Sequence, residues 1–420
     1  MRELAEVNYD DILRAHKVLR VVVRQTPMLH SKILADLVGG PVWLKCEHLQ
    51  RAGSFKIRGA YWRISRLTDA ERARGVIAAS AGNHAQGVAL AASVLGIRAT
   101  VVMPENAPLP KIAATRGYGA EVVLHGAAIA DSLAKAREIA DETGSVFIHP
   151  FDHPDVIAGQ GTVGVEIMDQ CPQARTILVP AGGGGLVAGV ALGVRGHQTA
   201  PVGAREAEAP EHVVAPEVIG VQAEAIAPFP GSLRAGRPVT VVASPTMADG
   251  IAVATPGDLT FEIISKLTSR VLTVTEDGLS RAMLLCLERA KQFVEPSGAA
   301  GVAALLEHPA EVEPPVVVLL SGGNIDPLLL SRVLRHGLAA AGRYLALRCR
   351  IFDLPGSLAA LLATLAAHGT NVLDVAHERV SASLAIEEVE VMLQLETRGP
   401  EHKEEIIAAL RATGYQLEFV

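Results

Sequence analysis

The sequence predicts an α/β protein with helix-covered parallel sheets, followed by a smaller unit of order βαββαβ. From Val42 to about Leu320, short β-branched runs alternate with Ala/Leu-rich stretches of helical period. After about Gly342 the pattern changes to a compact unit in which apolar residues alternate along strands. A chain of 420 residues is also too long for one ordinary core, so two or three domains are expected.

The first part of the chain shows strand and helix patterns in strict alternation. Alternation of this kind implies a parallel sheet with ligands at the carboxyl ends of its strands. The expected elements are strand Gly75–Ala79, helix Ala85–Leu95, strand Thr100–Met103, helix Pro110–Gly117 and strand Glu121–Leu124, then strands Thr176–Val179, Val218–Val221, Val271–Val274 and Val316–Leu320. The polar, Pro/Glu-rich interval Gly203–Glu217 is expected to be a surface excursion.

The last part of the chain has the ferredoxin-like order, a plan that hosts many functions. Ser357 is expected to cap its first helix, and Gly414 to follow its second. The expected elements are strand Leu345–Ile351, helix Leu358–Leu365, strand Val372–Val380, strand Val389–Leu395, helix Ile406–Leu410 and strand Tyr415–Val420.

Composition excludes several classes of function. A net charge of −7, without Lys/Arg clusters interleaved with aromatics, gives no basic surface for nucleic acid. The acidic N-terminus does not resemble a signal peptide, and no run reaches the roughly 18 apolar residues of a membrane span. The four cysteines lack metal-ligand or disulfide-framework spacing. These features predict a cytoplasmic protein without a structural metal.

Lys56 lies in the most informative segment, Ser54–Ala60. A lysine among apolar neighbours loses hydration, which lowers its pKa and leaves a lone pair free to attack a carbonyl. A lysine beside an arginine is otherwise a solvated pair on a helix face. Lys56 is therefore a candidate for Schiff-base chemistry only if other segments agree.

Three other segments agree with Lys56: Ser80–Gly87 (SAGNHAQG), the glycine run Gly182–Gly185, and Ser321–Asn324 (SGGN). In this order the four segments resemble the pyridoxal-phosphate enzymes of fold type II, the tryptophan-synthase-β type, and most closely the threonine dehydratases. The resemblance spans roughly residues 10–342. It implies a catalytic domain over 1–342, with a small subdomain of about 46–150 inserted in the large one.

The resemblance implies roles for the lysine and glycine segments. Lys56 would form the Schiff base with the cofactor aldehyde and then remove the substrate α-proton, and Phe55 would pack against the pyridine ring. Gly182–Gly185 and Leu186 would hold the phosphate, because backbone N–H groups at a helix start favour anions. The rival interpretation is a nucleotide fingerprint, since Gly183–Ala188 fits GxGxxA.

The resemblance also implies which residues surround the substrate and the cofactor ring. Asn83 would bind the ring hydroxyl, and Ser321 would face the pyridine nitrogen. A serine hydroxyl is too weak an acid to keep that nitrogen protonated, which favours prompt elimination. Gly250 and Glu295 would lie near the cofactor face, although a plain turn and a helix entry are alternatives. The substrate carboxylate would be held by Ser80, Ala81, Gly82, Asn83 and His84.

Two departures from related serine racemases narrow the function. Those enzymes carry a second serine where this chain has Ala81, so racemisation is disfavoured. Glu224 looks like the start of their cation loop, but Pro228 and Pro230 offer no carboxylate, so no divalent metal site is expected.

The sequence therefore predicts a threonine dehydratase that forms 2-oxobutanoate and ammonia, with L-serine as a poorer substrate giving pyruvate. The alternatives are a serine or hydroxyaspartate dehydratase, a racemase-type relative, or an inactive amino-acid sensor. The tail, 343–420, resembles an ACT domain, whose amino-acid effector, isoleucine or valine, would bind near Gly356 and Asn371. It could instead be a dimerisation appendage, and a homo-oligomer is expected.

Overall fold

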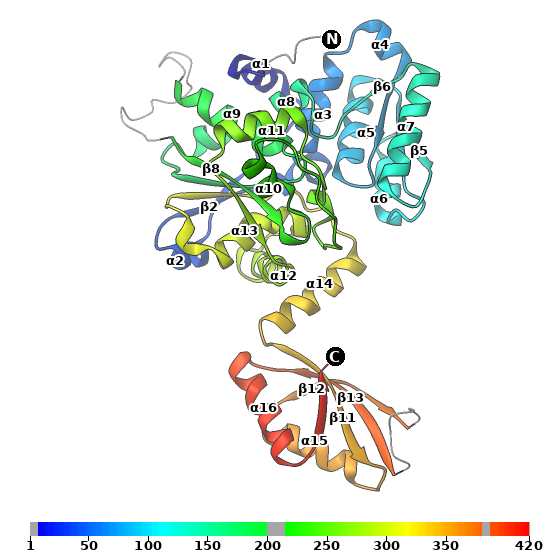
Figure 1. Ribbon diagram of the computed structural model, residues 1–420, viewed down its shortest axis with the longest axis vertical. Coiled ribbons are helices and arrows are strands. Elements are labelled where there is room, and N and C mark those ends of the chain that lie inside the picture. Colours follow the sequence, from blue (N-terminus) through cyan, green and yellow to red (C-terminus); the bar gives the residue numbers. More distant parts are fainter. Residues whose placement is uncertain (1–6, 200–214, 380–386, 420) are drawn as a thin grey trace. The chain divides into compact units, whose positions relative to one another are not determined.

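A computed structural model describes residues 7–199, 215–379 and 387–419 (Figure 1). The chain divides into two compact units, Met1–Leu329 and Leu330–Val420. Most of the expected excursion Gly203–Glu217 lies outside the described residues. The division falls near the start of helix α14 (Pro327–Ala340), whereas the boundary predicted near Gly342 would assign that helix to the catalytic domain.

The larger sheet of the first unit has the strand order β1-β2-β10-β7-β8-β9. All neighbouring pairs are parallel except β1 with β2. Buried residues alternate between the faces: Ile177 and Val179 face a core that includes helices α1, α8 and α9, while Leu178 lies against Gly301 of α13. The strands are β1 (Met28–His30), β2 (Val42–Lys45), β7 (Thr176–Pro180), β8 (Glu217–Ala223), β9 (Val271–Val274) and β10 (Val316–Leu319).

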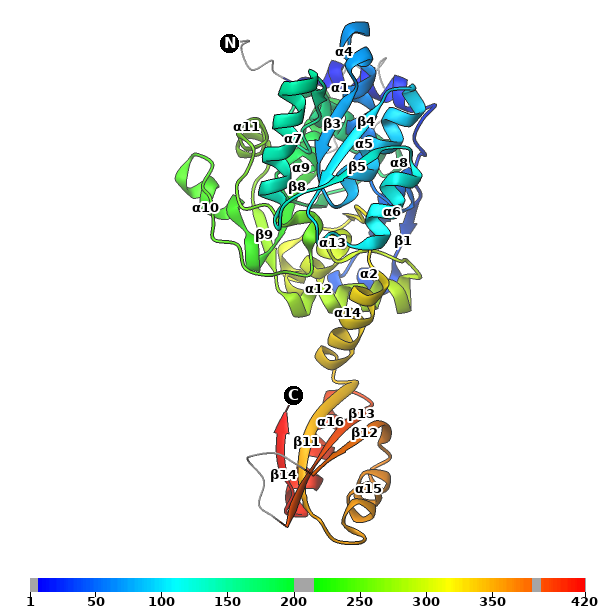
Figure 2. The same cartoon turned by 90° about the vertical axis from the view of Figure 1, so that its right-hand side faces the viewer.

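The smaller sheet of the first unit has the order β5-β4-β3-β6 and is parallel throughout (Figure 2). Its strands, β3 (Val76–Ala79), β4 (Ala99–Met103), β5 (Glu121–Leu124) and β6 (Val146–Phe147), all lie between β2 and β7 in sequence. Val76 and Ala78 face helices α3 and α5, whereas Ile77 and Ala79 face α7. The inner strands β3 and β4 are therefore almost completely buried on both faces, as is typical of a parallel sheet, whereas the edge strand β5 is partly exposed.

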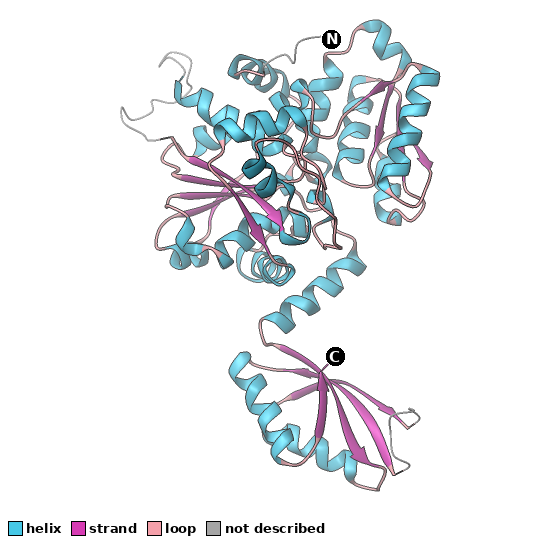
Figure 3. Ribbon diagram, viewed as in Figure 1, coloured by secondary structure: helices cyan, strands magenta, loops and turns pink. Residues whose placement is uncertain are grey.

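The helices of the first unit cover both sheets, as the colouring by secondary structure shows (Figure 3). They are α1 (Tyr9–Leu19), α2 (Lys32–Val38), α3 (Lys56–Ser65), α4 (Asp69–Arg74), α5 (Asn83–Leu95), α6 (Leu109–Gly117), α7 (Ile129–Thr143), α8 (Pro154–Gln170), α9 (Gly185–Thr199), α10 (Pro228–Ala235), α11 (Asp258–Leu267), α12 (Glu276–Leu285) and α13 (Pro296–Glu307). No helix among the described residues is long and apolar enough to cross a membrane.

The second unit contains an antiparallel sheet of order β12-β13-β11-β14. The predicted cap is wrong in detail: Gly356, with φ of 96°, occupies the N-cap of α15 and Ser357 is the first helical residue. The elements are β11 (Tyr344–Phe352), α15 (Ser357–Ala367), β12 (Asn371–Glu378), β13 (Glu388–Glu396), α16 (Pro400–Ala412) and β14 (Gln416–Phe419). Two parallel-sheet regions followed by a ferredoxin-like unit confirm the predicted fold class.

Candidate active site

Lys56 is the first residue of helix α3. Two short 3-10 helices lie between the end of β2 and this helix. The preceding residues are tied to the segment after β10. The Phe55 N–H donates to the Ser321 carbonyl at 3.2 Å, and Ser54 forms an isolated bridge with Gly322. Two of the predicted segments, which are more than 250 residues apart in sequence, are thus direct neighbours.

Lys56 as a whole residue is half-buried, and its amine donates to the Pro150 carbonyl at 3.0 Å. Its Nζ atom lies 5.2 Å from the centroid of the Phe55 ring. Desolvation lowers the pKa of Lys56 to about 8, and the charge of Glu295 opposes this only in part. A large share of the side chain is therefore neutral and nucleophilic near pH 8.

Asn83 joins the small subdomain to two residues of the large one. Its Nδ2 donates to Glu295 Oε1 at 2.6 Å, and its Oδ1 accepts from Asn324 Nδ2 at 2.8 Å. Burial raises the pKa of Glu295 to about 8, with the charge of Asp249 adding to the effect, so this carboxyl is mainly protonated at neutral pH. Asn83 and Glu295 were predicted separately from the sequence, and Asn324 was not predicted, although the SGGN segment contains it.

The loop between β3 and α5 carries Ser80, Ala81 and Gly82. The Gly82 N–H donates to Ser80 Oγ at 3.1 Å, and Gly82 is the N-cap of α5. The His84 side chain points elsewhere, because its Nε2 contacts the Ile148 carbonyl at 2.9 Å. Burial and the charge of Lys56 lower the pKa of His84 to about 3, so this imidazole is neutral. Only the backbone of His84 could bind a carboxylate here.

The glycine run connects the end of β7 to helix α9. The first turn closes with the Ala188 N–H on the Gly184 carbonyl, so the preceding N–H groups, including that of Leu186, have no intrahelical partner. Gly184 has a φ of 98°, and a Cβ on it would lie 2.7 Å from Phe229 Cζ. Position 184 therefore requires glycine, both because of its backbone conformation and because no space remains for a side chain.

Phe151 connects the glycine run to the lysine. A side chain on Gly183 would meet the Phe151 ring, and one on Gly185 would lie 2.9 Å from its Cβ. Phe151 directly follows Pro150, whose carbonyl holds the Lys56 amine. Phe151 was not predicted from the sequence, because a lone aromatic residue outside a motif gives no signal.

Gly250 and Ser321 lie in the same region of the large subdomain. A Cβ on Gly250 would be 2.9 Å from Ser297 Oγ and 3.8 Å from Glu295 Oε1. Ser297 Oγ is buried and has no hydrogen-bond partner among the described residues. Ser321 lies two residues after the end of β10 and is 4% exposed.

An ion pair between the two subdomains was also not predicted. Lys111 of α6 contacts Asp249 at 2.6 Å, with side-chain exposures of 12% and 52%. Both charges influence the carboxyl of Glu295. Lys111 and Asp249 lie 138 residues apart, so no local pattern could have joined them.

Gly356 and Asn371, the two candidate regulatory residues, lie at opposite ends of a single copy of the second unit. Gly356 precedes α15 beside the Phe352 end of β11, whereas Asn371 pairs with Glu396 at the Tyr344 end of the sheet. A nine-residue strand such as β11 is about 27 Å long. A single amino acid bound to one such unit could not contact both residues. Asn371 Nδ2 donates instead to Glu396 Oε2 at 3.0 Å.

The chain is similar to known proteins over nearly its whole length. It is 44% identical to an L-threonine ammonia-lyase of Thermotoga maritima over 99% of this chain and 100% of that relative. A protein of the same name from Geobacter sulfurreducens is 45% identical over 98% of each chain. A catabolic L-threonine dehydratase of Escherichia coli is 42% identical, with coverage of 78% of this chain and 95% of the relative.

Solved structures resemble the larger part of the chain. A threonine deaminase of T.th. matches with a TM-score of 0.69 and 42% identity, over 76% of this chain and 99% of that one. Maize serine racemase matches with a TM-score of 0.71 and 34% identity, over 79% and 98%. The sequence model described as pyridoxal-phosphate dependent enzyme covers residues 19–322. This chain is therefore a member of the pyridoxal-phosphate dependent enzyme family.

Proposed function

We propose that this protein is an L-threonine ammonia-lyase that converts L-threonine to 2-oxobutanoate and ammonia. The observation that carries the proposal is that the segments of Lys56, Asn83, the glycine run and Ser321 meet around one site. The full-length relatives from Thermotoga and Geobacter that bear this name support the same substrate.

The residues present fit pyridoxal phosphate. The open N–H groups at the start of α9 suit a phosphate, and the Lys56 amine suits an aldehyde. We assign the phosphate to Gly182–Gly185 with Leu186, the ring face to Phe55, and the ring hydroxyl to Asn83. When bound, the cofactor supplies an aldehyde that links to amines and a ring that accepts electron density from the adjacent carbon.

Lys56 is the residue that we expect to move the α-proton of the substrate. A pKa of about 8 leaves much of the amine free to act as a base near physiological pH. The Pro150 carbonyl at 3.0 Å holds the amine in place without neutralising it. The Ser321 hydroxyl is a weaker acid than a carboxylic acid, and we expect it to favour elimination over slower competing reactions.

The loop that follows β3 is the proposed site of the substrate carboxylate. The backbone N–H groups of Asn83 and His84 lie in the first turn of α5, where free donors and the helix dipole favour an anion, and Ala81 and Gly82 lead into that turn. Ala81 provides no hydroxyl on this loop. We therefore expect β-elimination rather than racemisation, despite the likeness to maize serine racemase.

The test is a product assay on the purified protein with pyridoxal phosphate. L-Threonine should give equal amounts of 2-oxobutanoate and ammonia, and L-serine should give pyruvate more slowly. Lys56→Ala should lower turnover by more than about a thousand-fold, because both the attachment point and the base are lost. A faster reaction with L-serine or a hydroxyaspartate would favour the alternative dehydratases, and no reaction with any of them would favour an inactive sensor.

We also propose that residues 343–420 form an ACT-type regulatory domain, and that the protein works as a cytoplasmic homo-oligomer. The full-length match to the Thermotoga relative supports a tail shared with other ammonia-lyases, whereas the Escherichia coli match uses nearly all of the relative yet only 78% of this chain. Because Gly356 and Asn371 are at opposite ends of the sheet, an effector that contacts both must lie between two copies of the unit.

Isoleucine or valine is the proposed effector, and the test is calorimetric titration into the full-length protein. Binding should change the apparent affinity for L-threonine by about 5- to 150-fold, with a reciprocal effect of threonine on effector binding. Asn371→Ala should weaken binding, because the amide that could hold the ammonium group is lost. If no amino acid binds while the protein still forms oligomers, the unit is an assembly element.

A further inference from the structure

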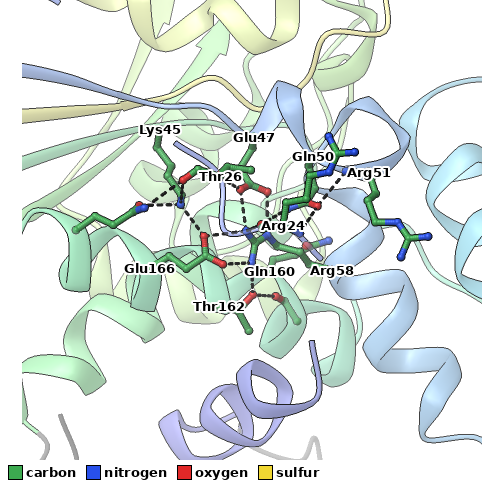
Figure 4. A network of polar contacts seen from close by, with 12 residues as sticks. Arg24, Thr26, Lys45, Glu47, Gln50, Arg51, Arg58, Gln160, Thr162 and Glu166 are labelled. Carbon is green, nitrogen blue, oxygen red and sulfur yellow. Dashed lines mark hydrogen bonds and ion pairs between the residues drawn. The ribbon is translucent and has the colours of Figure 1, made fainter. Parts of the chain in front are cut away.

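Four buried charged side chains form a network beside the active-site helix (Figure 4). Arg58 donates to both oxygens of Glu47, through Nε and Nη2 at 2.8 Å each. It also donates to both oxygens of Glu166, at 2.7 and 3.0 Å. Lys45 contacts Glu166 Oε2 at 2.6 Å. We call Lys45, Glu47, Arg58 and Glu166 the charge quartet; their side chains are at most 4% exposed.

The charge quartet contains two basic and two acidic side chains, and nearly all of its hydrogen-bonding groups have partners. Thr26 donates to Glu47 Oε1 at 2.6 Å, and the Thr162 hydroxyl accepts from Arg58 Nη1 at 3.1 Å. Burial alone would lower the pKa of Arg58, but the carboxylates of Glu47 and Glu166 raise it above its ordinary value. Arg58 is therefore charged in the folded protein, and the charges of Arg58 and Lys45 lower the pKa of Glu166.

Stability alone does not explain such a network. Moving charges out of water has a large cost, and apolar residues of similar volume often give equal or greater stability. A planar guanidinium that binds two carboxylates bidentately does, however, fix direction and position in a way that apolar contacts do not. We therefore expect the quartet to fix the relative positions of the segments that carry it and to add little to the free energy of unfolding.

The quartet joins the helix that begins with Lys56 to two other segments. Lys45 ends β2, Glu47 begins the following 3-10 helix, and Glu166 belongs to α8. Arg58 lies on α3, two residues after Lys56. Helix α3 already lies very close to α8, since a Cβ on Gly159 would be 2.6 Å from Gly59 Cα. That glycine contact sets the distance between the helices, and the Gly59 N–H also donates to Gln160 Oε1 of α8 at 3.2 Å. Arg58 adds the two bidentate contacts, one of which reaches α8 and the other the segment after β2.

We propose that the charge quartet fixes the sliding and rotation of helix α3, and that Arg58 is thereby a positioning residue for the Lys56 amine. The acceptor of that amine, the Pro150 carbonyl, lies just before α8, which carries Glu166. Arg58 therefore binds to α8, and the acceptor of the Lys56 amine lies in the loop that leads into the same helix. A rigid helix transmits any displacement at Arg58 to Lys56, half a turn away. As far as it concerns catalysis, this proposal rests on the proposed function.

The main test replaces all four charges by apolar residues of similar size, as Lys45→Met, Glu47→Leu, Arg58→Met and Glu166→Leu together. The unfolding temperature should stay the same or rise. The kcat for L-threonine should fall by about 100-fold, because a small misplacement of a reacting group has an effect of that order, while KM changes much less. An unchanged kcat in this folded variant would overturn the proposal.

A second variant keeps the proposal testable if the fourfold change does not fold. Arg58→Lys retains the cation but loses both bidentate contacts. It should lower kcat, because the contacts that fix direction are lost, and an unchanged kcat in Arg58→Lys would contradict the positioning role. The control removes a distant exposed pair, as Arg175→Met with Glu313→Leu, and should leave kcat unchanged.

An experiment on the cofactor-free protein tests this proposal independently of the proposed function. In the cofactor-free protein, the reaction of Lys56 with an amine-specific reagent should have its midpoint near the pKa of about 8. Arg58→Lys should move that midpoint toward the ordinary lysine value, because the amine is no longer held in its desolvated position. A midpoint unchanged by Arg58→Lys would count against the quartet, whatever the substrate of the enzyme is.

Discussion

The two units of this protein differ in where their side chains can do chemistry. In the first unit, the inner parallel strands are buried on both faces, and loops after β3, β7 and β10 carry Ser80, Gly182–Gly185 and Ser321. In the second unit, an antiparallel sheet carries alternating apolar residues such as Leu345, Leu347 and Cys349 into an apolar core. Parallel topology gathers loops at one edge, and antiparallel topology distributes them between both ends.

The fold and the candidate site of this protein can be predicted from the sequence to different degrees. The periodic patterns predict strands in both units to within a residue or two, as β3 and β9 show in the first and β11 and β13 in the second. The very short strands β1 and β6 were not predicted, because two or three residues carry no usable period. Short apolar runs in the first unit and alternating apolar residues in the second therefore predict strands equally well.

The site was predictable only where a local motif carries it. Lys56, Asn83 and the glycine run lie in segments whose residue types are dictated by backbone shape and chemistry. Long-range pairs such as Lys111 with Asp249 leave no trace in the sequence. Gly356 and Asn371 were placed together from a resemblance, and the strand register shows that one unit cannot unite them.

The largest expected effect distinguishes two left-handed glycines, one from each unit. Gly184→Ala forces a methyl group to 2.7 Å from Phe229 Cζ at a φ of 98°. It should lower the free energy of unfolding by about 2 kcal/mol or more, from strain and overpacking together. It should also weaken pyridoxal phosphate binding about tenfold or more, because a hydrogen bond to a charged group is disturbed.

The matched variant is Gly356→Ala, with a φ of 96° and no atom within 4 Å of the added carbon. It should cost only about 1 to 2 kcal/mol of backbone strain and leave cofactor binding unchanged. Chemical denaturation and absorbance titration with pyridoxal phosphate measure both quantities. Equal effects of the two variants on cofactor binding would remove the distinction between the units.

A second prediction concerns the pH dependence that the first unit imposes. The pKa of Glu295 is raised from 4.5 to about 8, so the folded protein holds more protons than the unfolded chain between these values. Stability contributed by this group is therefore present at low pH and is lost as the pH rises toward about 8. Glu295→Gln, which resembles the protonated acid, should flatten this decline in the cofactor-free protein. An identical decline in unfolding temperature for both proteins would show that Glu295 is ionised throughout.

The smallest expected effect concerns the ion pair between the subdomains. Lys111→Met should raise the KM for L-threonine by about five-fold or less, since a partly exposed pair contributes little. Asp249→Asn should act similarly, and added salt should reduce the difference from the unaltered protein. Lys135→Met removes an exposed pair with Glu138 within one helix and should have no effect on KM. An effect of Lys111→Met above a hundred-fold would mean that Lys111 touches the substrate.

The most direct test of the central claim is to find which lysine holds the cofactor. The protein is loaded with pyridoxal phosphate, reduced with borohydride, digested and mapped by mass spectrometry. The account predicts a reduced pyridoxyl group on the peptide that contains Lys56. The fully buried Lys45, held by Glu166, and Lys111, held by Asp249, should be unmodified. A label on either of these lysines, or no label at all, would contradict the assignment of Lys56.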